Sequence, residues 1–153
     1  MLAVAFIGKQ NEPLFFNHIE ASTASFDATS SASENLNILM IMHSSLDIVD
    51  ERKKKASLAA PSTFDLYLGP LLQVDDYRVF GHYSNTHIKT VVLCEGVSET
   101  ADAAVRDVVL ALRGLYISAI QNPFLMTDKP MESLSFRRRV QQLIETFNSR
   151  IKS

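Results

Sequence analysis

The chain has little of the residue types that small proteins use as cross-links or as tight turns. One cysteine, Cys94, stands among 153 residues, which excludes an intramolecular disulfide and a zinc site built on cysteines. Tryptophan is absent, and glycine and proline number only five each. The longest apolar run, residues 2–7, is far shorter than the roughly 20 residues that span a bilayer. These absences favour a soluble, reducing, intracellular environment.

Charge of neither sign dominates the sequence. Fifteen Lys and Arg residues oppose 17 Asp and Glu residues, so the net charge of −2 does not give the basic footprint of a nucleic-acid-binding protein. The apolar share of 46% is enough to build a buried core, and it excludes disorder throughout the chain. The length predicts a single domain over residues 1–153.

Hydrophobic periodicity predicts five strands and three helices. The strands cover residues 2–7, 14–19, 64–72, 77–83 and 88–94, and the helices cover 36–55, 98–121 and 130–151. Close spacing makes the first two strands a hairpin and the last three an antiparallel meander. The first strand is apolar throughout, so it belongs in the centre of the sheet, and Gly69-Pro70 places the third strand toward an edge. The order ββαβββαα predicts an α+β fold with a five-stranded antiparallel sheet.

A Ser/Thr-rich segment lies between the hairpin and the first helix. Residues 20–35 hold seven Ser or Thr residues, three acids and no basic side chain, without periodicity of either kind, so we expect a solvated loop. Ser31 and Glu34 have the spacing of a capping box, which predicts that the helix begins directly after them. Ala59-Ala-Pro61 is expected to end this helix.

The first helix has more apolar residues than one packed face requires. One stripe, at steps of three and four, comprises Leu39, Met42, Leu46 and Val49. A second band, formed by Ile38, Ile41 and Ile48, lies partly off that stripe. We therefore expect helix 36–55 to be a principal partner-binding surface, with Asp47 and Glu51 flanking the apolar band and setting orientation through charge. The alternative is that the three isoleucines lie under a loop.

Charged residues close this helix and recur in the last one. Asp50 and Lys54, and likewise Glu51 and Lys55, have the i,i+4 spacing of helical ion pairs. Residues 52–55 and 137–139 are basic runs that could contact anionic lipid or carboxylates of a partner. The simpler interpretation of both runs is a solvated helix end or face.

No arrangement of residues predicts catalysis or metal binding. The glycines do not form a phosphate-binding loop, and the histidines have no metal-ligand spacing. His82 and His87 lie on neighbouring strands but lack a third ligand, so two exposed histidines are the simpler interpretation. Cys94 ends an apolar run and is expected to be a buried small side chain rather than a nucleophile. We expect no enzyme activity, no catalytic residue, no metal and no cofactor.

A triplet at the end of the second helix matches a known short peptide. Asn122-Pro-Phe124 is the sequence that some endocytic modules bind, and such recognition requires an exposed loop. Because Asn122 and Pro123 terminate a helix, we expect Phe124 to pack against that helix. This expectation argues against a binding role for the triplet.

Five segments in order carry a resemblance to a known family. They are AFIGKQNEPLF at 5–15, HSSLDIVDE at 43–51, DLYLG at 65–69, DYRVFG at 76–81 and QNPF at 121–124. Together they resemble the sedlin-like small subunits of the TRAPP complex, and most closely the branch called TRAPP subunit two-like. The resemblance runs from about residue 3 to residue 147, apart from the Ser-rich segment.

The resemblance implies a longin-type fold and a role in vesicle-mediated transport. Members of the family are non-catalytic adaptors between the small-subunit core and the large subunits of a tethering assembly. That assembly promotes nucleotide exchange on Rab GTPases in ER-to-Golgi and Golgi transport, through other subunits. The chain would then be cytoplasmic, contact a Rab only indirectly, and reach Golgi membranes peripherally through the complex. The alternative is a longin domain of another trafficking complex, of the SNARE or coat-adaptor type.

Overall fold

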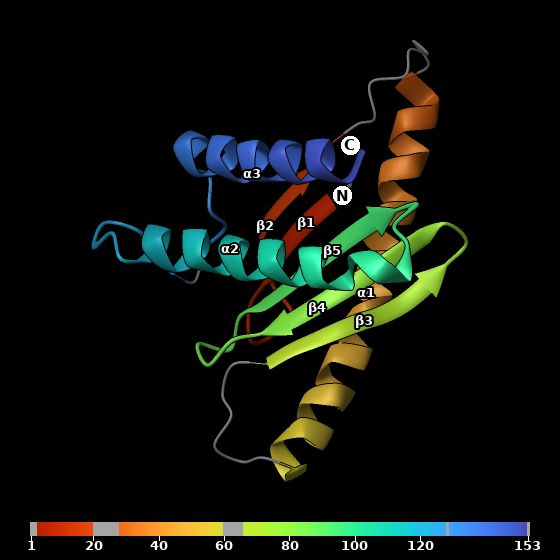
Figure 1. The fold of residues 1–153 in the computed structure, drawn as a ribbon. Coiled ribbons are helices and arrows are strands. Elements are labelled where there is room, and N and C mark those ends of the chain that lie inside the picture. The colour runs from red at the N-terminus through yellow and green to blue at the C-terminus, as the bar shows by residue number, and fades with distance from the viewer. Residues whose placement is uncertain (1–2, 20–27, 60–65, 128, 153) are drawn as a thin grey trace.

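The fold is built on one antiparallel sheet (Figure 1). The computed structural model describes residues 3–19, 28–59, 66–127 and 129–152, and within these ranges five strands lie in the order β2-β1-β5-β4-β3. The strands are β1 (Ala3–Ile7), β2 (Pro13–His18), β3 (Leu66–Val74), β4 (Tyr77–Tyr83) and β5 (Lys89–Glu95). The predicted hairpin and the predicted meander are both confirmed.

Helices cover both faces of the sheet. Helix α1 (Ala28–Ala59) lies on one face, while α2 (Asp102–Ile120) and α3 (Leu134–Lys152) lie side by side on the other (Figure 1). A short 3₁₀ turn, η1 (Glu99–Ala101), leads into α2. The order ββαβββαα is confirmed, and it is that of an α+β longin/sedlin-like fold.

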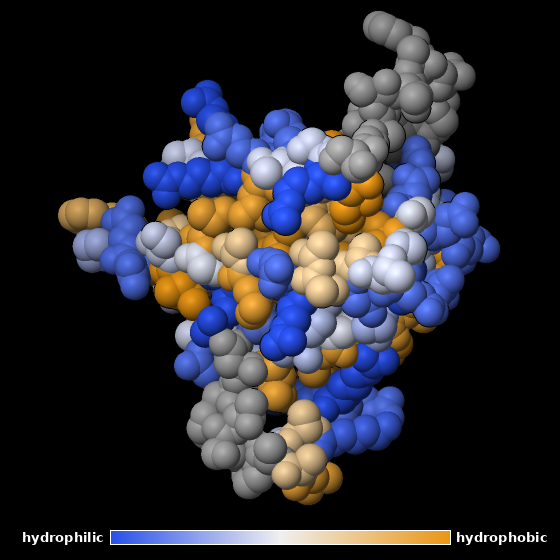
Figure 2. Space-filling model, viewed as in Figure 1, coloured by the Kyte–Doolittle hydropathy of each residue, from blue (hydrophilic) through white to orange (hydrophobic). Residues whose placement is uncertain are grey.

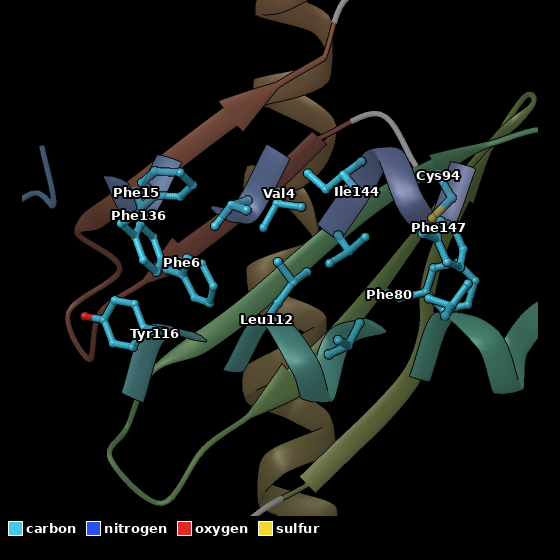
Figure 3. Packing of buried hydrophobic residues seen from close by; sticks show 14 of the residues in the cluster. Val4, Phe6, Phe15, Phe80, Cys94, Leu112, Tyr116, Phe136, Ile144 and Phe147 are labelled. Carbon is cyan, nitrogen blue, oxygen red and sulfur yellow. The ribbon is translucent and has the colours of Figure 1, made fainter. Parts of the chain in front are cut away.

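Alternating side chains of the central strands fill two cores. On β1, Val4 and Phe6 join the core under α2 and α3, whereas Ala3 and Ala5 join the core under α1. Both faces of β1 are therefore buried, as the continuous apolar run predicts. Figure 3 shows the first core, where the rings of Phe6 and Tyr116 stack with centroids 4.8 Å apart.

The two edges of the sheet are protected in different ways. On β3, the pairing register shifts around Gly69, which has a φ of 71°, and again after Pro70, so this edge is irregular, as the sequence predicts. On β2, the outward carbonyl of Leu14 accepts a hydrogen bond from the Met131 N–H at 2.6 Å. The Arg137 guanidinium donates to the carbonyl of Phe16 at 3.2 Å. These contacts occupy the β2 edge and hinder addition of another strand there.

The start of the first helix differs from the prediction. Helix α1 begins at Ala28, so residues 28–35 are helical rather than part of a loop, and Ser31 is not its N-cap. The rest of the predicted loop, residues 20–27, lies outside the described residues. Serine in place of alanine makes a helix less stable by only about 0.5 kcal/mol per residue. Each residue that extends an existing helix adds one backbone hydrogen bond, so the serines do not prevent an earlier helix start. The predicted end at Ala59 is confirmed.

Two details around the later helices also differ from the prediction. Ser98 does not cap α2, because its hydroxyl bonds the Thr100 hydroxyl at 2.8 Å and η1 intervenes. Helix α3 begins at Leu134 rather than Pro130, since the Ser133 hydroxyl accepts the Phe136 N–H and thereby takes the capping role.

Candidate partner-binding surface

Helix α1 presents one face to the sheet through a continuous apolar stripe. The buried members of the stripe are Ile38, Met42, Leu46 and Val49, each at most 4% exposed. They meet Ala5, Val91 and Leu93 of the central strands. Leu39, which the sequence assigned to this stripe, is 43% exposed instead.

Polar contacts fix the carboxyl half of α1 on the sheet. The Asp50 carboxylate lies 2.7 Å from the ammonium of Lys89, and this ammonium also donates to the side-chain carbonyl of Asn11 at 2.6 Å. The Arg52 guanidinium donates to the carbonyl of Leu68 at 2.7 Å. The helix therefore has a defined rotation about its axis, and the side chains that point away from the sheet have defined positions.

The side chains that point away form what we call the α1 outer face. Its members are Leu36, Leu39, Met40, His43, Asp47 and Glu51, all of them exposed. From Leu36 to Glu51, apart from Leu39, they follow one another at steps of four, three, four and four residues, which keeps them on one side of an α-helix. Leu36 is 62% and Met40 69% exposed, so the amino-terminal half of this face is apolar and the other half is acidic.

The structure separates the predicted partner-binding residues into two groups. Ile38 is 1% exposed and lies in the core, and Ile41 and Ile48 are half-buried against the same core. Ile38 therefore contributes nothing to the surface, because α1 is rotated so that this residue faces the sheet. Asp47 and Glu51 do lie on the exposed face, as expected. The hydrogen bond and the charge of Lys55, 2.6 Å away, lower the pKa of Glu51 and keep its carboxylate ionised.

The predicted partner-binding residues do not include the apolar part of the α1 outer face. Leu36 and Met40 belong to neither of the two apolar bands predicted for this helix, although their spacing to His43 and Asp47 places all four on one helical face. This spacing was the available signal. It was obscured because isoleucines of the same helix formed a more conspicuous second band.

An apolar groove adjoins the α1 outer face. Helix α1 packs on β3, β4 and β5, which leaves the β1–β2 corner of this side of the sheet less covered. The resulting groove has a volume of about 260 Å³. Its helix side is formed by Leu39, Met42 and His43, and its sheet side includes Ile7, Pro13 and Phe16. Leu39 and His43 thus belong to both features, which form one continuous surface.

Cys94 and His82, which were candidates for catalysis or metal binding, are both buried in the protein. Cys94 is fully buried, as predicted, and burial raises the pKa of its thiol to about 11. His82 is also buried, at 1% exposed, so the expectation of two exposed histidines is wrong for His82, whereas His87 is exposed. Alternation along β4 places His82 on the same face of the sheet as Phe80, which lies in the core under α2 and α3. Among the described residues, no group of three or more His, Cys, Asp or Glu side chains converges as a metal site would require.

Comparison with known proteins decides the family. The profile described as Sedlin matches residues 6–146. The chain belongs to the Sedlin family. Its curated relatives include the trafficking protein particle complex subunit 2-like protein of Dictyostelium discoideum, 31% identical over 94% of this chain and 96% of the relative. The proteins of the same name from Xenopus tropicalis and Mus musculus are 29% and 30% identical, with the same shares covered.

Membership of the Sedlin family confirms the resemblance carried by the five sequence segments. The match runs from the end of β1 through most of α3, so the α1 outer face and nearly all of the groove lie within the matched region. No helix in the described part of the chain combines the length and the apolar character needed to cross a membrane.

Proposed function

We propose that this chain is a non-catalytic adaptor subunit of a TRAPP-type tethering assembly. The observation that supports the proposal most is the exposed apolar patch of Leu36, Leu39 and Met40, which opens directly onto the apolar groove. Apolar patches of this kind, bordered by charges, mark protein interaction sites. The names of the relatives describe subunits of a trafficking particle, and their similarity extends over nearly the whole chain.

In the proposed role, this chain binds other subunits and does not itself catalyse a reaction. The chain, folded as one domain, joins the small-subunit core to the large subunits, while other subunits carry out nucleotide exchange on a Rab GTPase. It acts in ER-to-Golgi and Golgi transport, and it reaches membranes peripherally through the assembly. A purified sample of the chain alone is therefore expected not to accelerate nucleotide release from a Rab.

The side chains of the α1 outer face indicate what its partner presents, namely an apolar ridge and a cationic side chain. An apolar ridge of the partner would cover Met40 and enter the groove beside Leu39, where apolar surface leaves water. A cationic side chain of the partner would face Asp47, which fixes the register of docking more than it adds affinity. The rigid attachment of α1 to the sheet means that little ordering is required on binding.

Affinity purification with quantitative mass spectrometry tests the proposal. The tagged chain should recover the other subunits of a TRAPP-type assembly, and Met40→Asp should reduce that recovery by about 30-fold or more, because a carboxylate would be buried in the centre of the interface. Leu58→Asp is the matched control, since Leu58 is 87% exposed and lies on the same helical side five turns further along α1.

Two results would contradict the proposal. Recovery of SNARE or coat-adaptor chains in place of TRAPP subunits would support the alternative longin function. Unchanged recovery of TRAPP subunits with Met40→Asp would show that the partner docks elsewhere on the chain.

A further inference from the structure

The loop between α2 and α3 exposes the ring of Phe124, which is predicted from the sequence to pack against a helix. Phe124 is 93% exposed, so the expectation that it packs against α2 is wrong. The ring points away because Leu125, the next residue, takes the position against the core under α2 and α3. Single exposed apolar residues are common on protein surfaces, so exposure by itself does not define a site.

The backbone around Phe124 provides the second observation. The side-chain carbonyl of Asn122 accepts a hydrogen bond from the Phe124 N–H at 3.1 Å, and the Asn122 backbone carbonyl accepts the Leu125 N–H at 3.0 Å. Pro123 occupies the second position of this β-turn, where its fixed φ is favourable. Residues 122–125 therefore form a turn that is held by two hydrogen bonds in the free protein.

The turn is also anchored at both ends. Its first residue continues from α2, since the Asn122 N–H donates to the carbonyl of Ala119 at 3.2 Å. After the turn, the Met131 N–H attaches the returning chain to β2. Figure 2 shows an apolar projection at the end of this loop, beyond the end of α2 in Figure 1. A rigid base with a projecting ring reduces the conformational entropy that a partner must remove on binding.

The exposed groups define what could bind. The Phe124 ring requires a small apolar pocket, and the Asn122 amide NH₂ can still donate a hydrogen bond after its carbonyl is used in the turn. Residues 121–127 carry no charged side chain, so no charge would have to be desolvated when the turn enters a pocket. Aromatic anchors in such pockets dominate the energy of many interfaces.

We propose that the exposed Asn122-Pro-Phe turn is a second binding site, which docks into a peptide-recognition module of the endocytic type that binds Asn-Pro-Phe peptides. This site is independent of the α1 outer face, because α1 lies on one side of the sheet and the α2–α3 loop belongs to the other (Figure 1). The chain can therefore hold both partners at once, and the turn links the assembly to a protein that carries such a module.

Titration of the ¹⁵N-labelled full chain with a purified Asn-Pro-Phe-binding module tests this proposal by NMR. Shifts are expected at residues 121–127, and an unlabelled Asn-Pro-Phe peptide should reverse them by competing for the module. Phe124→Ala should weaken binding by about 30-fold or more, as truncation of an aromatic anchor does. The same variant should leave the thermal unfolding midpoint unchanged, because Phe124 makes little contact with its own chain.

Two further variants separate recognition from turn geometry. Asn122→Asp keeps a carboxylate oxygen that can accept the Phe124 N–H, but it removes the NH₂ donor and adds charge, so binding should be lost while the turn persists. Met126→Ala, at a neighbouring residue that is 61% exposed, should leave affinity within about threefold. Absence of shifts at millimolar module, or binding that Phe124→Ala does not weaken, would overturn the proposal.

Discussion

The ion pair between Asp50 of α1 and Lys89 of β5 predicts an asymmetric response to substitution. The Lys89 side chain is 3% exposed, whereas that of Asp50 is 39% exposed. A charged group inside the protein is unfavourable when its partner is removed, while a charge near the surface regains contact with water. The two partners should therefore differ greatly in what their removal does to stability.

The expected magnitudes follow from the contacts that remain. Asp50→Asn should lower the free energy of unfolding by about 3 kcal/mol, the low end for a broken buried pair, because Asn11 still accepts one hydrogen bond from Lys89. Lys89→Met removes the buried charge and fills a similar volume, so its effect should be at most about 1 kcal/mol. The double variant should be as stable as Lys89→Met alone, so the two effects should depart from additivity by about 3 kcal/mol.

Urea unfolding followed by far-ultraviolet circular dichroism measures these differences, since the chain lacks tryptophan for fluorescence. Glu51→Gln is the matched control on the same helix, because the Glu51–Lys55 pair is exposed and its removal should barely change stability. The reasoning would be refuted if Lys89→Met destabilised the protein as much as Asp50→Asn, or if the two effects added in the double variant.

Three further predictions concern buried groups. Burial raises the pKa of Cys94 from 9.0 to about 11, which lowers the fraction of reactive thiolate at pH 8 by about 100-fold. The thiol should therefore be alkylated at least about 100-fold more slowly in the native than in the denatured protein; equal rates would contradict this. Burial likewise raises the pKa of Tyr67 from 10.0 to about 12, so between about pH 9 and 12 the folded state holds more protons than the unfolded state, at Cys94 first and then at Tyr67. The free energy of unfolding, measured by denaturant titrations at alkaline pH, should therefore fall over this range; a rise would refute the assignment. Gly81→Ala places a Cβ 2.5 Å from Leu71 Cδ1 and should lower the free energy of unfolding in urea by about 1–3 kcal/mol. In the Leu71→Ala background the same substitution should cost less, because the clashing side chain is gone; strictly additive effects of the two substitutions would exclude the clash.

Local patterns were sufficient to predict most of the fold. The apolar run of β1 and the Gly69-Pro70 irregularity of β3 each specify a place in the sheet through backbone and burial rules that act within a few residues. The Glu51–Lys55 pair was predicted from spacing for the same reason. Helix boundaries were predicted less well. Serines near the start of α1 are compatible with either a cap or a helical turn, and the energy difference is small.

The candidate site depended on contacts between distant segments. Spacing alone placed Asp50 beside Lys54, but the fold brings it to Lys89, 39 positions away in the chain. The groove exists because α1 packs over β3 to β5, which no local pattern in α1 specifies. The exposure of Phe124 likewise follows from Leu125, its neighbour, taking the place against the core.

Oxidation of exposed methionines tests most directly whether the α1 outer face is covered in the assembly. Met40 and Met126 are 69% and 61% exposed, whereas Met42 and Met131 are buried, so the first two should oxidise quickly in the free chain and the other two slowly. When the chain is bound in a purified TRAPP-type assembly, the rate at Met40 should fall several-fold while the rate at Met126 stays unchanged. Oxidation of Met40 at the same rate in the free and the assembled chain would contradict the proposed role of α1.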